Sequence, residues 1–226
     1  MIETKDSLKL GLIVGFSLAA CLTFVLFAMQ MNNYWLAAAG KLTLFLGFSL
    51  TYFCLYSRRD FKPLFELYRK KYILISVVFG IVTFVSVIGG YYILRNQFNP
   101  AAILASLANS KITETTYPFV FIYIVVVNAL LEEFFFRGFM FLTLFRLGYK
   151  KFAYIFSALL FSLYHYPIIG NVVSPLFLLL ALVGLFAGGS FLNEVTRRCK
   201  NIWGALIIHI GANLAINSIA AYFFYF

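Results

Sequence analysis

Charged residues are scarce in this sequence, and acidic residues are the scarcest. Asp and Glu together occur 8 times, Lys and Arg 18 times, and charged residues make up only 12% of the 226 positions, whereas hydrophobic residues make up 63%. So few polar side chains cannot cover the surface of a soluble domain. The composition therefore places the chain among membrane proteins and excludes a soluble domain of useful size.

Cysteine and histidine are also rare. The three cysteines, Cys21, Cys54 and Cys199, are odd in number, far apart and mostly inside apolar runs. This pattern indicates neither a disulfide framework nor a cysteine metal site. The net charge of +10 does not predict a nucleic-acid partner, because the basic residues lie between apolar runs and form no single stripe or tail.

Long apolar runs fill most of the chain. A helix needs roughly 20 mostly apolar residues to cross the ~30 Å hydrocarbon layer. Runs of suitable length lie at about 8–31, 36–57, 72–94, 119–147, 152–167, 174–193 and 202–226. They predict an all-α fold, a polytopic bundle of about seven transmembrane helices. The fifth run ends at Tyr166-Pro167, where proline disfavours a helix in the residue before it.

The basic residues alternate between connections. Two lysines, Lys5 and Lys9, lie before or at the start of the first run, six basic residues lie in 58–71, and three lie in each of 146–151 and 197–200. The opposite connections hold only Arg95 and Lys111. Because positive charge collects on the cytoplasmic side, the N-terminus is predicted to be cytoplasmic and the C-terminus outside.

Three features outside the predicted spans indicate how the helices meet each other and the membrane surface. Segment 56–72 mixes basic and aromatic residues, which is typical either of a surface helix on anionic lipid headgroups or of a plain topology loop. Segment 95–117 is the one long outer loop, with room for a flap or a partial helix. Two pairs of glycines have the spacing that permits close helix contact, namely Gly11 with Gly15 and Gly184 with Gly188.

Three charged residues stand inside the fourth run, and they are Glu132, Glu133 and Arg137. Each charge near the bilayer centre costs about 2.5–3.5 kcal/mol on insertion scales. Glu133 and Arg137 are four residues apart on one helix face, so we expect them to pair. Glu132 is turned about 100° away and is left without a local charged partner, although Asn128 lies one turn before it.

The two histidines of the chain lie on later helices at similar predicted depths. His165 ends the fifth run, and His209 stands one turn before Asn213 in the seventh. At a rise of ~1.5 Å per residue, Glu132, His165 and Asn213 each lie about 20 Å along the helix from the basic connection next to their run. His209 lies about 13 Å from Lys200 by the same measure. The four side chains are therefore predicted to meet in one buried pocket.

This set of groups suits hydrolysis of a peptide bond. A carboxylate and an imidazole can hold and deprotonate a water molecule, while a second imidazole and an amide can donate hydrogen bonds to an oxyanion. Alternatively, Glu132, His165 and His209 bind zinc and leave one position open for water. No HExxH motif is present, so the choice between a glutamate-type and a metal-dependent enzyme stays open.

The order of these residues is similar to that of a known family. EEFFFR begins at Glu132, FSLYH ends at His165, and HIGAN runs from His209 to Asn213. In these motifs, which fall within about 119–220, the sequence resembles the CAAX protease and bacteriocin-processing (CPBP, or Abi) family of intramembrane peptidases. The type II CAAX prenyl endopeptidase is one of its eukaryotic relatives.

The resemblance implies a role for each residue. Glu132 and His165 would activate the water, His209 and Asn213 would stabilise the oxyanion, and Glu133 with Arg137 would be a supporting pair. Residues 119–226 would form the catalytic helical core, and residues 1–118 would be transmembrane helices and loops of unassigned role.

The same likeness implies where the protein acts and on what. We expect a multi-pass protein of the bacterial plasma membrane that cleaves a membrane-associated protein or peptide, in maturation or bacteriocin self-immunity. A second hypothesis is a non-proteolytic regulator or immunity protein that binds a membrane partner such as a sensor kinase. A transporter is less favoured, because residues 1–118 contain no polar set that matches the one in the C-terminal half.

Overall fold

The computed structural model describes residues 2–97, 99–170 and 173–225, and this part of the chain forms helices without a strand. Seven helical segments within it are long and apolar enough to cross a membrane. They are Asp6–Gln30 of α1 (Ile2–Gln30), α2 (Tyr34–Tyr56), α4 (Lys70–Leu94), the composite helix Tyr117–Arg146, Lys150–Ile169 with α9 (Lys150–Leu163) and α10 (Tyr166–Ile169), α11 (Pro175–Cys199) and α12 (Trp203–Tyr225). The prediction of an all-α polytopic bundle of about seven spans is confirmed.

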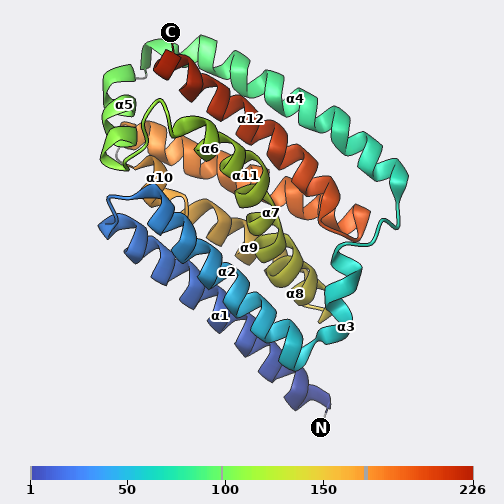
Figure 1. The fold of residues 1–226 in the computed structure, drawn as a ribbon. Coiled ribbons are helices and arrows are strands. Elements are labelled where there is room, and N and C mark those ends of the chain that lie inside the picture. The colour runs from blue at the N-terminus through green and yellow to red at the C-terminus, as the bar shows by residue number, and fades with distance from the viewer. Residues whose placement is uncertain (1, 98, 171–172, 226) are drawn as a thin grey trace.

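The fourth span is the central helix of the bundle (Figure 1). It consists of α6 (Tyr117–Ile122), η3 (Tyr123–Asn128), α7 (Ala129–Glu132), η4 (Glu133–Leu142) and α8 (Thr143–Arg146), of which η3 and η4 are π-helical. Every residue from 131 to 144 is buried. A helix that is apolar nearly all round is buried on all sides, and this position explains why its few charged residues lie at the heart of the molecule.

The other spans surround this helix in pairs, of which α1 with α2 and α9 with α11 are antiparallel and α4 with α12 is parallel. Figure 1 shows α1 beside α2 on one flank and α4 beside α12 on the opposite flank, and α9 packs against α11. The central helix contacts α2 on one side and α12 on the other. Residues on α2 and α12 can therefore reach the same charged groups from opposite directions.

Helix α12 crosses α4 at two glycines. A Cβ atom added to Gly211 would lie 2.4 Å from the backbone oxygen of Gly80, so the two backbones are in direct contact. The pairs predicted from spacing, Gly11 with Gly15 and Gly184 with Gly188, meet nothing within 4 Å in the described chain. The spacing permits close contact at these glycines, but no close contact with the described residues forms there, because close approach also depends on which helix faces meet.

The connections between spans only partly match the predictions. Segment 56–72 forms two short helices, α3 (Arg58–Phe61) and η1 (Lys62–Leu64), so it is not a continuous surface helix. Backbone atoms of this segment bind the start of α12, with Ile202 N donating to Leu64 O at 3.1 Å. These contacts hold the segment against the core instead of leaving it a free amphipathic helix.

The outer loop contains the partial helix that was expected. It forms η2 (Arg95–Gln97) and then α5 (Pro100–Asn109), which begins where the Asn99 side chain accepts a hydrogen bond from Ala102 N. The chain termini lie at opposite ends of the bundle in Figure 1. This arrangement agrees with an odd number of spans, while the side on which each terminus lies stays a prediction.

Candidate active site

The predicted pair of Glu133 and Arg137 is formed at the centre of the bundle. Arg137 Nη1 donates to Glu133 Oε1 at 3.0 Å, and both side chains have no exposed surface. The guanidinium also lies over the Phe161 ring, 4.1 Å from its centroid. A buried charge is tolerated when an opposite charge and hydrogen bonds compensate it, so this pair makes the helix compatible with the membrane interior.

His209 joins the same carboxylate. Its Nδ1 atom lies 2.7 Å from Glu133 Oε1, the oxygen that Arg137 also contacts. An ionised carboxylate only accepts hydrogen bonds, so Nδ1 is the protonated nitrogen of the ring. The other ring nitrogen, Nε2, faces Glu132 with 3.6 Å between Nε2 and Oε2. Glu133 therefore determines which nitrogen of His209 is available to the site.

Glu132 has a cationic partner that the sequence interpretation missed. Lys41 Nζ lies 2.5 Å from Glu132 Oε1, 2.6 Å from Asn128 Oδ1 and 3.2 Å from the Tyr164 hydroxyl. Asn128 in turn donates from Nδ2 to the same Glu132 oxygen at 2.6 Å. The expectation that Glu132 lacks a charged partner holds only for its own helix, because Lys41 comes from α2, 91 positions earlier.

A sequence signal for Lys41 did exist. It is an isolated charge in the middle of the run at 36–57, and the insertion cost that singled out Glu132 applies to it equally. Its side chain is 5% exposed. What the sequence does not contain is the identity of its partner, since that depends on how α2 packs against the fourth span.

His165 lies where the fifth span breaks between α9 and α10. Its Nδ1 lies 2.6 Å from the Phe161 backbone oxygen, so Nδ1 donates and Nε2 is left as an acceptor. The ring packs against Tyr164, with 4.2 Å between centroids, and Tyr164 also accepts a hydrogen bond from Lys41. His165 therefore lies next to the group formed by Lys41, Glu132 and Tyr164. Its Nε2 atom makes no hydrogen bond to Phe161.

Asn213 belongs to a chain of amide contacts on α12. Its Nδ2 donates to the Ile124 backbone oxygen at 3.0 Å, within the π-helical segment η3. Asn217 donates to the Asn213 backbone oxygen at 2.8 Å, and Tyr117 donates to the Asn217 backbone oxygen at 2.7 Å. One amide hydrogen of Asn213 is therefore engaged with the fourth span, which leaves the second as the donor that an oxyanion role requires.

The predicted zinc ligands Glu132, His165 and His209 do not form a metal site as they are placed. Within the described ranges, no three His, Cys, Asp or Glu side chains are grouped so that they could hold one ion. The ammonium of Lys41 also lies against Glu132 Oε1, and a cation already bound to the carboxylate competes with a second one. The residues do not fit zinc, and we derive no step through a metal.

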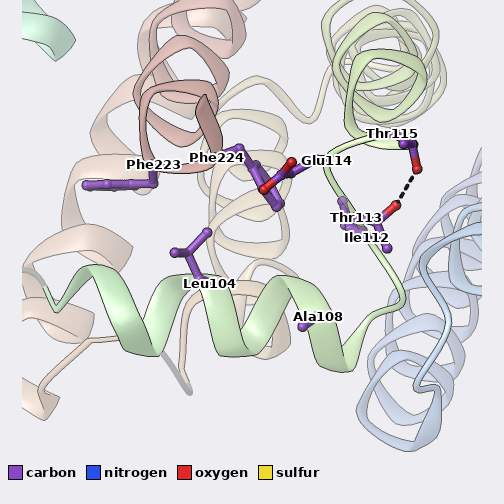
Figure 2. A pocket seen from close by; sticks show the side chains of 8 residues that line it. All are labelled: Leu104, Ala108, Ile112, Thr113, Glu114, Thr115, Phe223 and Phe224. Atoms are coloured by element: carbon purple, nitrogen blue, oxygen red, sulfur yellow. Dashed lines mark hydrogen bonds between the residues drawn. The ribbon is translucent and has the colours of Figure 1, made fainter. Parts of the chain in front are cut away.

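A separate cavity of about 470 Å³ lies between α5, the loop that follows it and the end of α12 (Figure 2). Its lining includes Leu104, Glu114 and Phe224, and none of the residues described above contributes to it. Its lining is mostly apolar, with Glu114 as its one charged side chain. This cavity does not contain the groups of the candidate active site.

Seven spans around a buried cluster of carboxylates, imidazoles and their cations define a multi-pass membrane protein with the groups of a hydrolytic site. Residues 114–215 match the family model described as Type II CAAX prenyl endopeptidase Rce1-like. Through this segment the chain is similar to the CAAX protease (CPBP) family of intramembrane proteases. The resemblance seen in the three motifs is confirmed.

The matched segment contains Glu132, His165, His209 and Asn213, whereas Lys41 lies outside it. The same comparisons find no matching curated protein and no matching solved structure.

Proposed function

We propose that this protein is an intramembrane endopeptidase that hydrolyses a peptide bond of a membrane-associated protein or peptide, with 119–226 as its catalytic core. The observation that carries the proposal is the placement of Glu132 Oε2. This oxygen is buried, accepts no hydrogen bond from the described residues, and lies 3.6 Å from His209 Nε2. A general base must present an unused oxygen within reach of a water proton, and Oε2 meets this requirement.

In the proposed reaction, Glu132 and His165 act on the attacking water. The water oxygen forms a bond to the scissile carbonyl carbon while Glu132 Oε2 takes its proton, and His165 Nε2 accepts the second hydrogen bond of the water. The carbon–nitrogen bond then breaks, and the proton held by Glu132 passes to the leaving amine. Each proton that leaves the water is thereby accounted for in the two products.

The oxyanion that develops on the carbonyl would be stabilised by His209 and Asn213. His209 donates from Nε2 only when the ring carries both protons, because Nδ1 is already bonded to Glu133. Glu133, held in place by Arg137, supports this role, because its carboxylate lies against the His209 ring and favours the form with both protons. One oxyanion donor is worth about 10²–10³ in kcat in other hydrolases, so Asn213 is an auxiliary group and Glu132 is the essential one.

The family match supports a membrane-associated peptide or protein as the class of substrate. The particular substrate is part of the proposal. A protein with these motifs fits peptide maturation or bacteriocin self-immunity in a bacterial plasma membrane, with the basic connections facing the anionic lipid headgroups of the cytoplasmic leaflet. The glutamate-type mechanism is favoured over a metal-dependent one because the zinc ligand set is not assembled.

The test uses purified protein in lipid nanodiscs with a library of membrane peptides. Products are identified by mass spectrometry for the wild type, for Glu132→Gln and for Glu114→Gln. Glu114 is exposed and lies outside the cluster, so its variant controls for the same chemical change elsewhere. We expect new termini with the wild type and Glu114→Gln but none with Glu132→Gln. If Glu132→Gln keeps its biological effect in cells, the regulator that binds a membrane partner replaces the peptidase.

A further inference from the structure

Lys41 lies on α2, outside the segment that matches the family model. Its ammonium group lies within the buried cluster around Glu132. Nζ carries three N–H donors. Three acceptors surround it, namely Glu132 Oε1, Asn128 Oδ1 and the Tyr164 hydroxyl. Every donor has one acceptor, so the ammonium is fully bonded in a single orientation.

Lys41 supplies the ammonium partner of Glu132. Arg137 is committed to Glu133 at 3.0 Å. Lys41 is the one Lys or Arg within ion-pair distance of Glu132 among the residues that the structure places. Burial favours the neutral form of a carboxyl group, and a neighbouring cation favours its ionised form. A base must be ionised to accept a proton, so the cation that keeps Glu132 ionised contributes to its chemistry.

The two oxygens of Glu132 have different surroundings. Oε1 accepts from Lys41 and from Asn128, at 2.5 and 2.6 Å. Oε2 accepts from no described side chain and is the oxygen that faces His209. The ion pair therefore binds one oxygen and leaves the other directed at the imidazole, so it does not block the carboxylate.

We infer that Lys41 is a positioning residue for Glu132, which holds Oε1 so that Oε2 is ionised and aimed at the reacting water. The inference rests on the proposed function of Glu132. Its consequence is that the helix pair of α1 and α2 is part of the enzyme, because α2 delivers the group that prepares the base. A purely structural lysine would affect folding and leave the turnover of folded protein unchanged.

The test compares three variants on α2 with the peptide cleaved by the wild type. Lys41→Met removes the charge and keeps a flexible chain of similar length, and Lys41→Arg keeps the charge with a different geometry. Ser49→Ala removes a buried hydroxyl two turns away on the same helix that has no partner in the described chain, and it controls for general changes to α2. kcat and KM are measured on protein that elutes as a single folded species.

We expect kcat to fall about 10²-fold in Lys41→Met with KM little changed, since misplacement of a reacting group by about 1 Å has an effect of this size. Lys41→Arg should recover part of this loss, and Ser49→Ala should match the wild type. A kcat for Lys41→Met equal to that of the wild type overturns the inference. A higher kcat also overturns it, because the ion pair of Lys41 with Glu132 would then inhibit the enzyme.

Thermal unfolding separates this inference from the proposed function. Lys41→Met should lower the unfolding midpoint when Glu132 is present and should not lower it in the Glu132→Gln background, where the buried ammonium has lost its carboxylate partner. Equal losses in both backgrounds mean that Lys41 serves packing alone and overturn the inference. If the wild type cleaves no peptide, the proposed peptidase function is refuted instead. The unfolding midpoints of the wild type, the two single variants and the double variant still show whether Lys41 and Glu132 stabilise each other.

Discussion

His209 Nδ1 lies 2.7 Å from Glu133 Oε1, across 76 positions of sequence and two different helices. The same oxygen accepts from Arg137 at 3.0 Å, so the predicted supporting pair is in fact a group of three. The pair was inferred from spacing on one helix, and spacing gave no indication that it also orients a histidine of α12. Glu133 therefore links the structural cation to an imidazole of the candidate active site.

Removal of Arg137 should destabilise the fold. Arg137→Ala leaves Glu133 buried without its cation, and loss of one partner of a buried pair typically costs about 3–5 kcal/mol. We expect less folded protein in detergent and a lower unfolding midpoint. Arg197→Ala is the matched control, because Arg197 pairs with Glu194 at the exposed end of α11, where such a pair contributes about 0–1 kcal/mol. Normal folding of Arg137→Ala with lost cleavage would place Arg137 in the reaction instead.

Glu132 and His165 should behave as one unit. Glu132→Gln keeps the shape of the side chain and removes the base, so cleavage should be abolished in a protein that still folds. Adding His165→Ala should then lower the rate little further, since groups that act together give non-additive losses. The measurement is the single-turnover rate of each single variant and of the double variant. Independent, multiplicative losses would show that the two residues act in separate steps.

The contact between α4 and α12 should tolerate no side chain at Gly211. Its Cβ would lie 2.4 Å from Gly80 O, so Gly211→Ala must push the helices apart, at a cost of about 1–3 kcal/mol or more. Because α12 carries His209 and Asn213, cleavage should fall as well. Gly188→Ala on α11 is the control, since nothing lies within 4 Å of its Cβ. Equal unfolding midpoints for the two variants would contradict this helix crossing.

The orientation in the membrane can be tested with reporter fusions. The basic connections at 58–71, 146–151 and 197–200 lie on one side of the bundle by the seven-span count, and the rule that positive charge stays inside makes that side cytoplasmic. A reporter at the C-terminus should therefore be active outside, and one inserted after Lys62 should be active in the cytoplasm. A cytoplasmic C-terminus would require an even number of spans and would contradict the helix assignment.

Features that depend on one helix alone could be predicted from the sequence. The apolar runs predicted the seven spans because the bilayer demands about 20 apolar residues from each helix. The spacing of Glu133 and Arg137 predicted their pairing because residues four apart share a face. The end of the fifth run at Tyr166-Pro167 predicted a helix boundary in this region, and the structure has α9 ending at Leu163 and Pro167 in the first turn of α10.

Contacts between helices were decided only by the tertiary structure. The ion pair of Lys41 with Glu132 and the hydrogen bond of His209 to Glu133 join residues 91 and 76 positions apart. Periodicity shows which residues share a face of one helix, but not which face of another helix packs against it. In a bundle where nearly every face is apolar, many packings satisfy the pattern equally. The buried charges and the close contact at Gly80 and Gly211 help to select one of them, because an unpaired buried charge or a clash of backbones costs about 1–5 kcal/mol.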